Sequence, residues 1–159
     1  MTISIRPATP KDVPTVAFLI RALSQYEKLE HEVTMTEDRL RATMFGPRPY
    51  AEALLAEDDG KPVGFALFFH NYSTFLAQPG LYLEDLYVPE SHRGKGIGKS
   101  LLVQLAKIAV ERNCGRLEWA VLDWNVDAIG FYEKLGAKPN SEWTVYRLTG
   151  DSLNSLAGQ

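Results

Sequence analysis

Glycine alternates with charged and apolar residues in one short stretch of the chain, Arg-Gly-Lys-Gly-Ile-Gly-Lys-Ser at residues 93–100. The stretch lies between an apolar run typical of a strand and a periodic apolar run typical of a helix. Glycines let the backbone approach an anion and turn N–H groups toward it, and a following helix adds its positive end. With the charges of Arg93, Lys95 and Lys99, the loop suits a pyrophosphate. A solvated basic turn is the alternative.

Three phosphate-binding patterns compete for this loop. The P-loop pattern G-x-x-x-x-G-K-[ST] requires glycine at position 93, where this chain has Arg93. The dinucleotide pattern G-x-G-x-x-G fails because Gly94, Gly96 and Gly98 are each separated by a single residue. The pattern that matches is R-x-x-G-x-G, formed by Arg93, Gly96 and Gly98.

Two adjacent carboxylates, Glu84 and Asp85, interrupt an apolar run at residues 80–88 that predicts a strand. Strict alternation along a strand would place them on opposite faces of the sheet. A carboxylate in such a run costs free energy unless it is paired or serves a site. The two residues therefore indicate a buried ion pair, an edge position or a binding site.

A second acidic stretch, residues 26–38, has five acidic residues against one lysine. It predicts a solvated surface or an electrostatic attraction for a cationic molecule. The three histidines have no ligand spacing, so we expect no metal site. Cys114 is the one cysteine, which excludes an intrachain disulfide and favours a reducing compartment.

Length and composition indicate one globular domain, residues 1–159. Hydrophobic residues make up 45% of the chain and charged residues 23%, which is typical of a protein with a packed core. The net charge of −3 argues against a general nucleic-acid binder. The sequence shows neither a bilayer-spanning run nor a secretory signal, so we expect a cytoplasmic protein without membrane association.

The hydrophobic pattern predicts a single α/β domain, with a mixed, mostly antiparallel central sheet flanked by helices. Strands are expected at residues 3–8, 50–57, 62–70, 80–88, 116–123 and 143–148. Helices are expected at residues 10–26, 36–46, 97–113 and 125–136, with a weak terminal helix at the end of the chain. Thr9 is expected to cap the first of these helices, with Asp12 in its first turn. Asp-Asp-Gly-Lys at residues 58–61 predicts a hairpin turn between the second and third strands.

Four segments, residues 5–12, 23–30, 81–102 and 121–137, resemble the GCN5-related N-acetyltransferase (GNAT) superfamily. Within it they are similar to the diamine (spermidine/spermine) and thialysine acetyltransferases, and residues 121–125 look closer to the thialysine branch. The resemblance implies the GNAT fold, acetyl-CoA as cosubstrate and a homodimer.

The resemblance also implies which residues hold the cosubstrate. The R-x-x-G-x-G loop would bind the pyrophosphate of acetyl-CoA, the backbone of the preceding strand would pair with the pantetheine arm, and Asn125 would help to fix that arm. Taken alone, an asparagine after Trp124 is more often a helix cap, and one residue can serve both roles. The implied cofactor-binding residues are Leu86, Val88, Arg93, Gly94, Lys95, Gly96, Ile97, Gly98, Lys99, Ser100 and Asn125.

The same resemblance assigns the chemistry. Tyr132 would act as general acid toward the departing thiolate, since a phenol can donate a proton to it. Its alternative is an aromatic core residue beside Phe131. Glu84 would deprotonate the amine through water, with Asp85, Tyr26 and Glu27 lining the amine site. No role is assigned to Glu142 or Trp143, because the group's equivalent tryptophan follows a longer loop.

The expected function is therefore transfer of an acetyl group from acetyl-CoA to the primary amine of a small cationic acceptor, by direct attack. Acetylation of a protein lysine or N-terminus is an alternative, which would need an open peptide groove. A non-catalytic acyl-CoA-binding domain is another, and it would need neither Tyr132 nor Glu84.

Overall fold

The computed structural model describes residues 2–159, which divide after Ala120 into two compact units. The first unit holds the sheet and the glycine loop, and the second holds the last helices of the chain.

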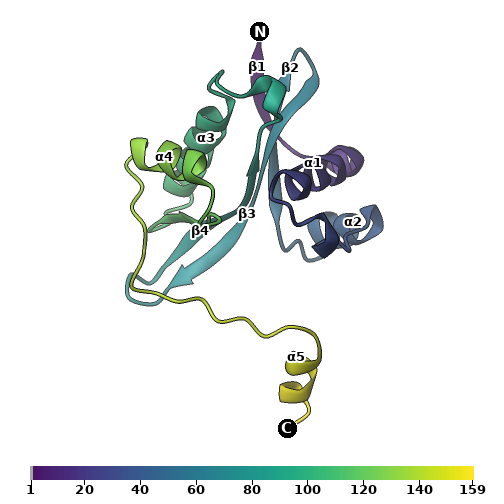
Figure 1. Ribbon diagram of the computed structural model, residues 1–159, viewed down its shortest axis with the longest axis vertical. Helices are drawn as coiled ribbons and strands as arrows, with labels where there is room; N and C mark the ends of the chain where they lie inside the picture. Colours follow the sequence, from purple (N-terminus) through teal and green to yellow (C-terminus); the bar gives the residue numbers. More distant parts are fainter. Residues whose placement is uncertain (1) are drawn as a thin grey trace. The chain divides into compact units, whose positions relative to one another are not determined.

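A five-stranded sheet forms the first unit, with the strands in sequence order (Figure 1). The first four strands pair antiparallel and the last pair is parallel, which confirms the mixed sheet expected from sequence. The hairpin turn between the second and third strands holds Asp59 at φ 50° and Gly60 at φ 79°, the left-handed pair that a tight hairpin requires. The strands are β1 (Ile3–Pro7), β2 (Glu52–Asp58), β3 (Lys61–Ser73), β4 (Gln78–Tyr87) and β5 (Leu117–Trp119).

Helices cover both faces of this sheet, with α1 and α2 on one face and α3 on the other (Figure 1). On the first face Val13, Val16 and Leu19 of α1 pack into one buried cluster with Phe65 of β3. On the other face α3 begins at the glycine loop and buries one side, including Leu101. The helices are α1 (Val13–Tyr26), α2 (Glu37–Phe45) and α3 (Ile97–Glu111), with short 3-10 turns at η1 (Pro10–Asp12), η2 (Glu30–Glu32) and η3 (Glu90–His92).

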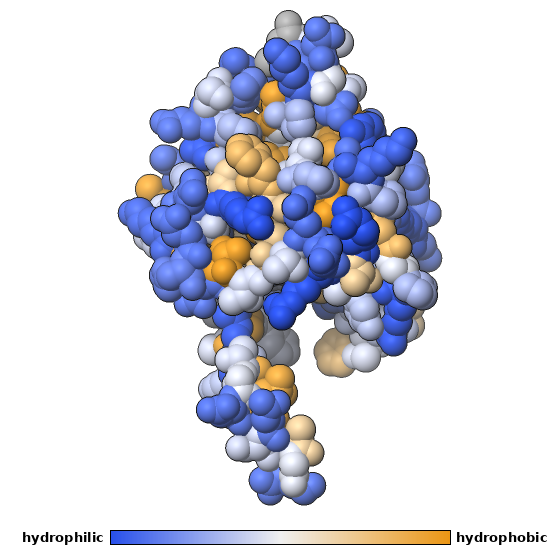
Figure 2. Space-filling view, turned by 90° about the vertical axis from the view of Figure 1, so that its right-hand side faces the viewer, coloured by the Kyte–Doolittle hydropathy of each residue, from blue (hydrophilic) through white to orange (hydrophobic). Residues whose placement is uncertain are grey.

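The solvent-facing side of α1 and α2 is mostly hydrophilic, with isolated apolar side chains among the charged ones (Figure 2). The apolar residues of both helices are instead in the cluster beneath them, as the helical spacing of Val13, Val16 and Leu19 predicts. These helices are therefore held mainly by the face that they turn to the sheet.

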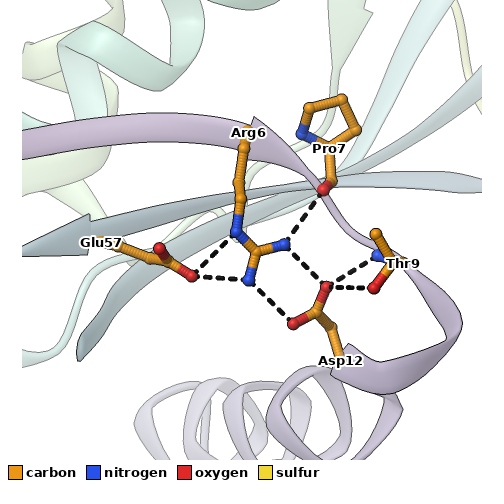
Figure 3. Close-up of polar contacts among 5 residues, drawn as sticks. All are labelled: Arg6, Pro7, Thr9, Asp12 and Glu57. Atoms are coloured by element: carbon orange, nitrogen blue, oxygen red, sulfur yellow. Dashed lines mark hydrogen bonds and ion pairs between the residues drawn. The ribbon is translucent and has the colours of Figure 1, made fainter. Parts of the chain in front are cut away.

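Arg6 links β1 to the start of the first helical segment (Figure 3). Its guanidinium donates to both carboxylate oxygens of Asp12, at 2.8 and 2.9 Å, and to Glu57 of β2 at 2.6 Å. Asp12 also accepts from the backbone N–H of Thr9 at 2.7 Å, which closes the expected N-terminal cap. Hydrogen bonds from Arg6 and Thr9 hold the pKa of the Asp12 carboxyl well below its usual range.

Asp12→Asn is expected to lower the free energy of unfolding by about 1–2 kcal/mol at pH 7, because it removes a charge-assisted fork that is only partly screened by solvent. The lowered pKa means that this stabilisation is present above the usual carboxyl range and is lost as the pH falls below it. Urea denaturation at pH 7 and pH 3 measures the difference. Asp59→Asn is the matched control, since asparagine accepts the same left-handed backbone; an equal loss in both variants would contradict the role of the Arg6 fork.

The second unit contains two helices, α4 (Val126–Lys134) and α5 (Gly150–Ala157), in agreement with the expected helices. The expected strand at residues 143–148 is wrong: no strand forms there, although the backbone is not helical. A strand needs a neighbour for its N–H and C=O groups, and no strand of residues 2–159 pairs with this segment. Its apolar side chains are exposed, by 76% at Trp143, 87% at Val145 and 92% at Tyr146.

The expected strand at residues 116–123 is also shorter than the sequence pattern suggests, because β5 ends at Trp119.

No helix within residues 2–159 has the length and apolar character needed to cross a bilayer. In the same range, no three side chains of His, Cys, Asp or Glu gather as metal ligands would.

Candidate active site

The glycine loop connects β4 to α3 through backbone conformations that favour glycine. Gly94 has φ 76° and Gly96 has φ 82°, both in the left-handed region, and a Cβ at either position would meet no atom within 4 Å. Glycine is needed here for its backbone rather than for space. Gly96 is the N-cap of α3, and its side-chain hydrogen cannot cap the helix.

The first turn of α3 therefore has unused donors. Its first helical bond runs from the N–H of Ser100 to the carbonyl of Gly96, at 2.9 Å, so the preceding N–H groups have no acceptor in the helix. Lys95 and Lys99 are exposed beside them, while the side chain of Ile97 is buried and fixes the turn in the core. The hydroxyl of Ser100 donates to the Gly96 carbonyl at 3.0 Å. This arrangement fits an anionic group at the helix start.

A bulge in β4 determines the orientation of the adjacent carboxylates. Asp85 lies opposite Leu67 of β3, but Leu83 lies opposite Phe68, so Glu84 is an extra residue without a partner. Because Leu67 and Phe69 share one face of β3, Asp85 lies on the same face as Tyr82, which pairs with Phe69. The bulge breaks the strict alternation expected for this strand, so that Leu83 and Asp85 lie on opposite faces although they are two residues apart.

Glu27, Glu84 and Asp85 form a group that we call the acidic trio. Burial, with like charge from Glu84 and Glu27, raises the pKa of Asp85 to about 7. Burial and the charge of Glu84 also raise the pKa of Glu27. No Lys or Arg of residues 2–159 forms an ion pair with any member of the trio. Uncompensated carboxylates that repel one another bind cations favourably.

The acidic trio is assembled from two elements. Glu27 follows α1, whose last residue is Tyr26, and the helix ends there because Lys28 adopts a left-handed φ of 61°. Glu84 and Asp85 come from the bulge of β4. The sequence prediction that Tyr26 and Glu27 lie near these two acids is consistent with the mutual electrostatic effects of Glu27, Glu84 and Asp85.

The far half of β4 has an open edge. β5 pairs with β4 only along Leu81–Leu83, so within residues 2–120 no strand continues beside Leu86 and Val88 on that side. An open strand edge offers backbone groups to an extended molecule. The Val88 carbonyl already accepts a hydrogen bond from Nε of Arg93, at 2.8 Å.

The side chain of Arg93 packs against two aromatic rings. Its guanidinium carbon is 4.4 Å from the centre of the Tyr26 ring and 5.7 Å from that of the Tyr87 ring. The first residue of the loop and a residue of the expected amine site are thus in direct contact.

The remaining expected site residues, Asn125 and Tyr132, lie in the second unit. The side-chain oxygen of Asn125 accepts from the N–H of Ala128 at 3.3 Å, so it caps α4. Tyr132 lies in the last turn of α4, with its ring centre 5.5 Å from that of Phe131. The helix cap expected for Asn125 is confirmed. The cofactor role of Asn125 and the acid role of Tyr132 stay predictions.

Two tyrosines near the site have no role in the sequence-based assignment. Tyr82 shares a face with Asp85, and burial followed by the charge of Glu84 raises the pKa of its phenol. Tyr87 lies under Arg93. Both belong to the run Tyr-Leu-Glu-Asp-Leu-Tyr, and the aromatic residues that flank the two acids are the signal for them in the sequence.

Known proteins are similar to this chain in sequence and in fold. A sequence profile described as the Acetyltransferase (GNAT) family matches residues 17–137. A thialysine N-epsilon-acetyltransferase of Bos taurus is 38% identical, over 99% of this chain and 98% of its own. An L-ornithine N5-acetyltransferase of Arabidopsis thaliana is 36% identical, over 96% of this chain and 86% of its own.

Solved structures give the same result for the fold. An integron cassette protein from the mobile metagenome of V. cholerae superposes with a TM-score of 0.84, at 30% identity over 100% of this chain and 99% of its own. The family match covers strands β2 to β5, the glycine loop and α4. The chain therefore belongs to the acetyltransferase (GNAT) family, and it is an N-acetyltransferase.

Proposed function

We propose that this enzyme, acting as one domain over residues 1–159, uses acetyl-CoA to acetylate the primary amine of a small cationic acceptor. The observation that carries the proposal is the acidic trio, whose three carboxylates have no cationic partner within the described chain. A diamine or amino-acid acceptor would supply the missing positive charge. The named activities of the relatives, on thialysine and L-ornithine, support this acceptor class.

The trio also suits the chemistry of the acceptor. An amine attacks only in its neutral form, so a base must take its proton. The Glu84 carboxylate is exposed on the bulge and is suited to accept that proton through a water molecule. Asp85 and Glu27, together with Tyr26, would hold the rest of the cationic acceptor.

Residues of the glycine loop would hold the cosubstrate, which supplies an activated acetyl thioester when bound. The backbone donors at the start of α3 and the charges of Arg93, Lys95 and Lys99 suit its pyrophosphate. The open edge at Leu86 and Val88 suits the pantetheine arm, and Asn125 would fix that arm. Tyr132 would donate the proton that the departing thiolate takes up.

Two other activities fit the family. An enzyme acting on a protein lysine or N-terminus would need an open groove for the peptide, whereas the acidic trio suits a small cationic acceptor. An acyl-CoA-binding domain without catalysis would need the loop but neither Glu84 nor Tyr132.

A CoA-release assay on a panel of amines tests the proposal. Thialysine, ornithine, putrescine and spermidine should each be compared with a lysine-containing peptide and with uncharged benzylic amides as a blank. We expect release that depends on a small cationic acceptor. Release with the peptide alone would favour the protein acetyltransferase, and no acceptor-dependent release would favour the binding domain.

We also propose that the enzyme is a cytoplasmic homodimer. The exposed apolar side chains of residues 143–148 support the dimer, because a solvent-exposed apolar segment of extended chain is typical of an interaction surface. Light scattering should give twice the 17.8 kDa mass of one chain. Val145→Asp should shift the protein toward the monomer, whereas Ser141→Asp should not; a wild-type monomer at micromolar concentration would contradict the proposal.

A further inference from the structure

Arg93 makes three contacts that leave part of its guanidinium unused. Nε donates to the Val88 carbonyl at 2.8 Å, and the guanidinium carbon lies 4.4 Å from the centre of the Tyr26 ring and 5.7 Å from that of the Tyr87 ring. These contacts involve the end of β4, the residue that follows it and the last residue of α1. The two terminal amino groups have no acceptor among residues 2–159 and are exposed beside the loop.

Tyr26 is directly followed by Glu27 of the acidic trio, and the helix ends at this point. A guanidinium over an aromatic ring is attracted by the ring's negative face, by an amount that corresponds to about 2- to 30-fold in an equilibrium. The contact therefore restrains the end of α1 where it contributes to the acceptor site. Arginine is suited to this because its planar group can stack and donate hydrogen bonds at the same time.

We propose that Arg93 is a positioning residue for the acceptor: it holds Tyr26 in place and so couples the glycine loop to the amine site. This inference rests on the proposed function. An anion at the terminal amino groups would restrain the same guanidinium that holds Tyr26. Acceptor affinity then depends on occupancy of the loop, and by linkage the loop's affinity depends on the acceptor to the same degree.

Binding measurements on the wild type test the coupling directly. Calorimetry should show that spermidine or thialysine binds about 3- to 10-fold tighter when CoA is bound, and that CoA binds tighter by the same factor when the amine is present. In Arg93→Ala this factor should fall to about one, and the KM for the amine should rise about 3- to 10-fold.

Variants of Tyr26 distinguish a positioning role of Arg93 in the amine site from a general weakening of CoA binding. Tyr26→Phe keeps the ring and should keep the coupling, whereas Tyr26→Ala should remove it. In the Tyr26→Ala background, Arg93→Ala should raise the amine KM no further, although it still weakens CoA binding. Lys95→Ala is the control for lost loop charge: it should weaken CoA binding without changing the amine KM at saturating acetyl-CoA. Independent, multiplicative effects of Arg93→Ala and Tyr26→Ala on the amine KM would overturn the proposal.

A double-mutant cycle in urea denaturation gives a readout without activity. Arg93→Ala and Tyr26→Ala should show a coupling of about 3- to 10-fold in the folding equilibrium. If no amine is acetylated or bound, the proposed function fails, and the cycle still decides whether the Arg93–Tyr26 contact exists. Zero coupling in the cycle would overturn the positioning role in either case.

Discussion

Replacing Tyr132 with phenylalanine is expected to lower kcat by about 100-fold or more, because general acid catalysis by a positioned side chain contributes about 10²–10⁴-fold. The substitution removes one oxygen atom and keeps the ring, which lies beside Phe131 in the last turn of α4. The Kd for CoA should change by less than about twofold, since the phenol is expected to act on the departing thiolate rather than to hold the cosubstrate. Stopped turnover with intact binding distinguishes this role from a packing role.

Tyr146→Phe is the matched control for Tyr132→Phe. It removes the same atom from a tyrosine that is 92% exposed in the same unit, so its kcat should equal that of the wild type. The alkaline limb of the kcat profile should disappear in Tyr132→Phe if the phenol is the acid. An unchanged kcat would exclude Tyr132 as the acid and favour its alternative role as an aromatic core residue.

Local sequence signals predicted the parts of the fold that depend on local chemistry. The cap at Thr9 and Asp12, the left-handed turn at Asp59 and Gly60 and the glycine loop before α3 each follow from residue types within a few positions of one another. In each case the backbone conformation is decided by the residues that form it. The residue types alone were therefore enough to predict these three features.

The features that the sequence did not predict depend on partners far along the chain. Nothing in the run around Glu84 signals that β4 has one more residue than β3 opposite it, so the shared face of Tyr82 and Asp85 could not be inferred from alternation. The apolar pattern of residues 143–148 is that of a strand, but pattern alone does not supply a neighbouring strand. The contact between Arg93 and Tyr26 could not be predicted either, because it joins two segments that are distant in sequence.

Burial of Asp85 beside two other carboxylates gives the acidic trio a cost in stability. The pKa of Asp85 is about 7 in the folded protein, against a usual 3.8, so the folded state binds the proton more tightly than the unfolded chain. As the pH rises from about 4 to about 7, the contribution of Asp85 to the free energy of unfolding is therefore expected to fall, by about 1.4 kcal/mol per pH unit and by at most about 4 kcal/mol in all. Active sites commonly hold such unfavourable groups.

Asp85→Asn is accordingly expected to stabilise the protein by about 2–4 kcal/mol at pH 8 and by little at pH 4, because asparagine carries no charge at either pH. Urea denaturation at both pH values measures this, with Asp123→Asn as the control at a site where no stabilisation is expected. Asp85→Asn should also raise the amine KM about 10-fold at pH 8. The increase should be smaller at pH 6, where Asp85 is already mostly protonated in the wild type. Gained stability together with lost acceptor affinity is the result expected if the charge of Asp85 serves a cationic substrate. If the wild type and Asp85→Asn lose stability in parallel as the pH rises, Asp85 is not the group responsible for that loss. An unchanged amine KM in Asp85→Asn would show that Asp85 is not part of the acceptor site.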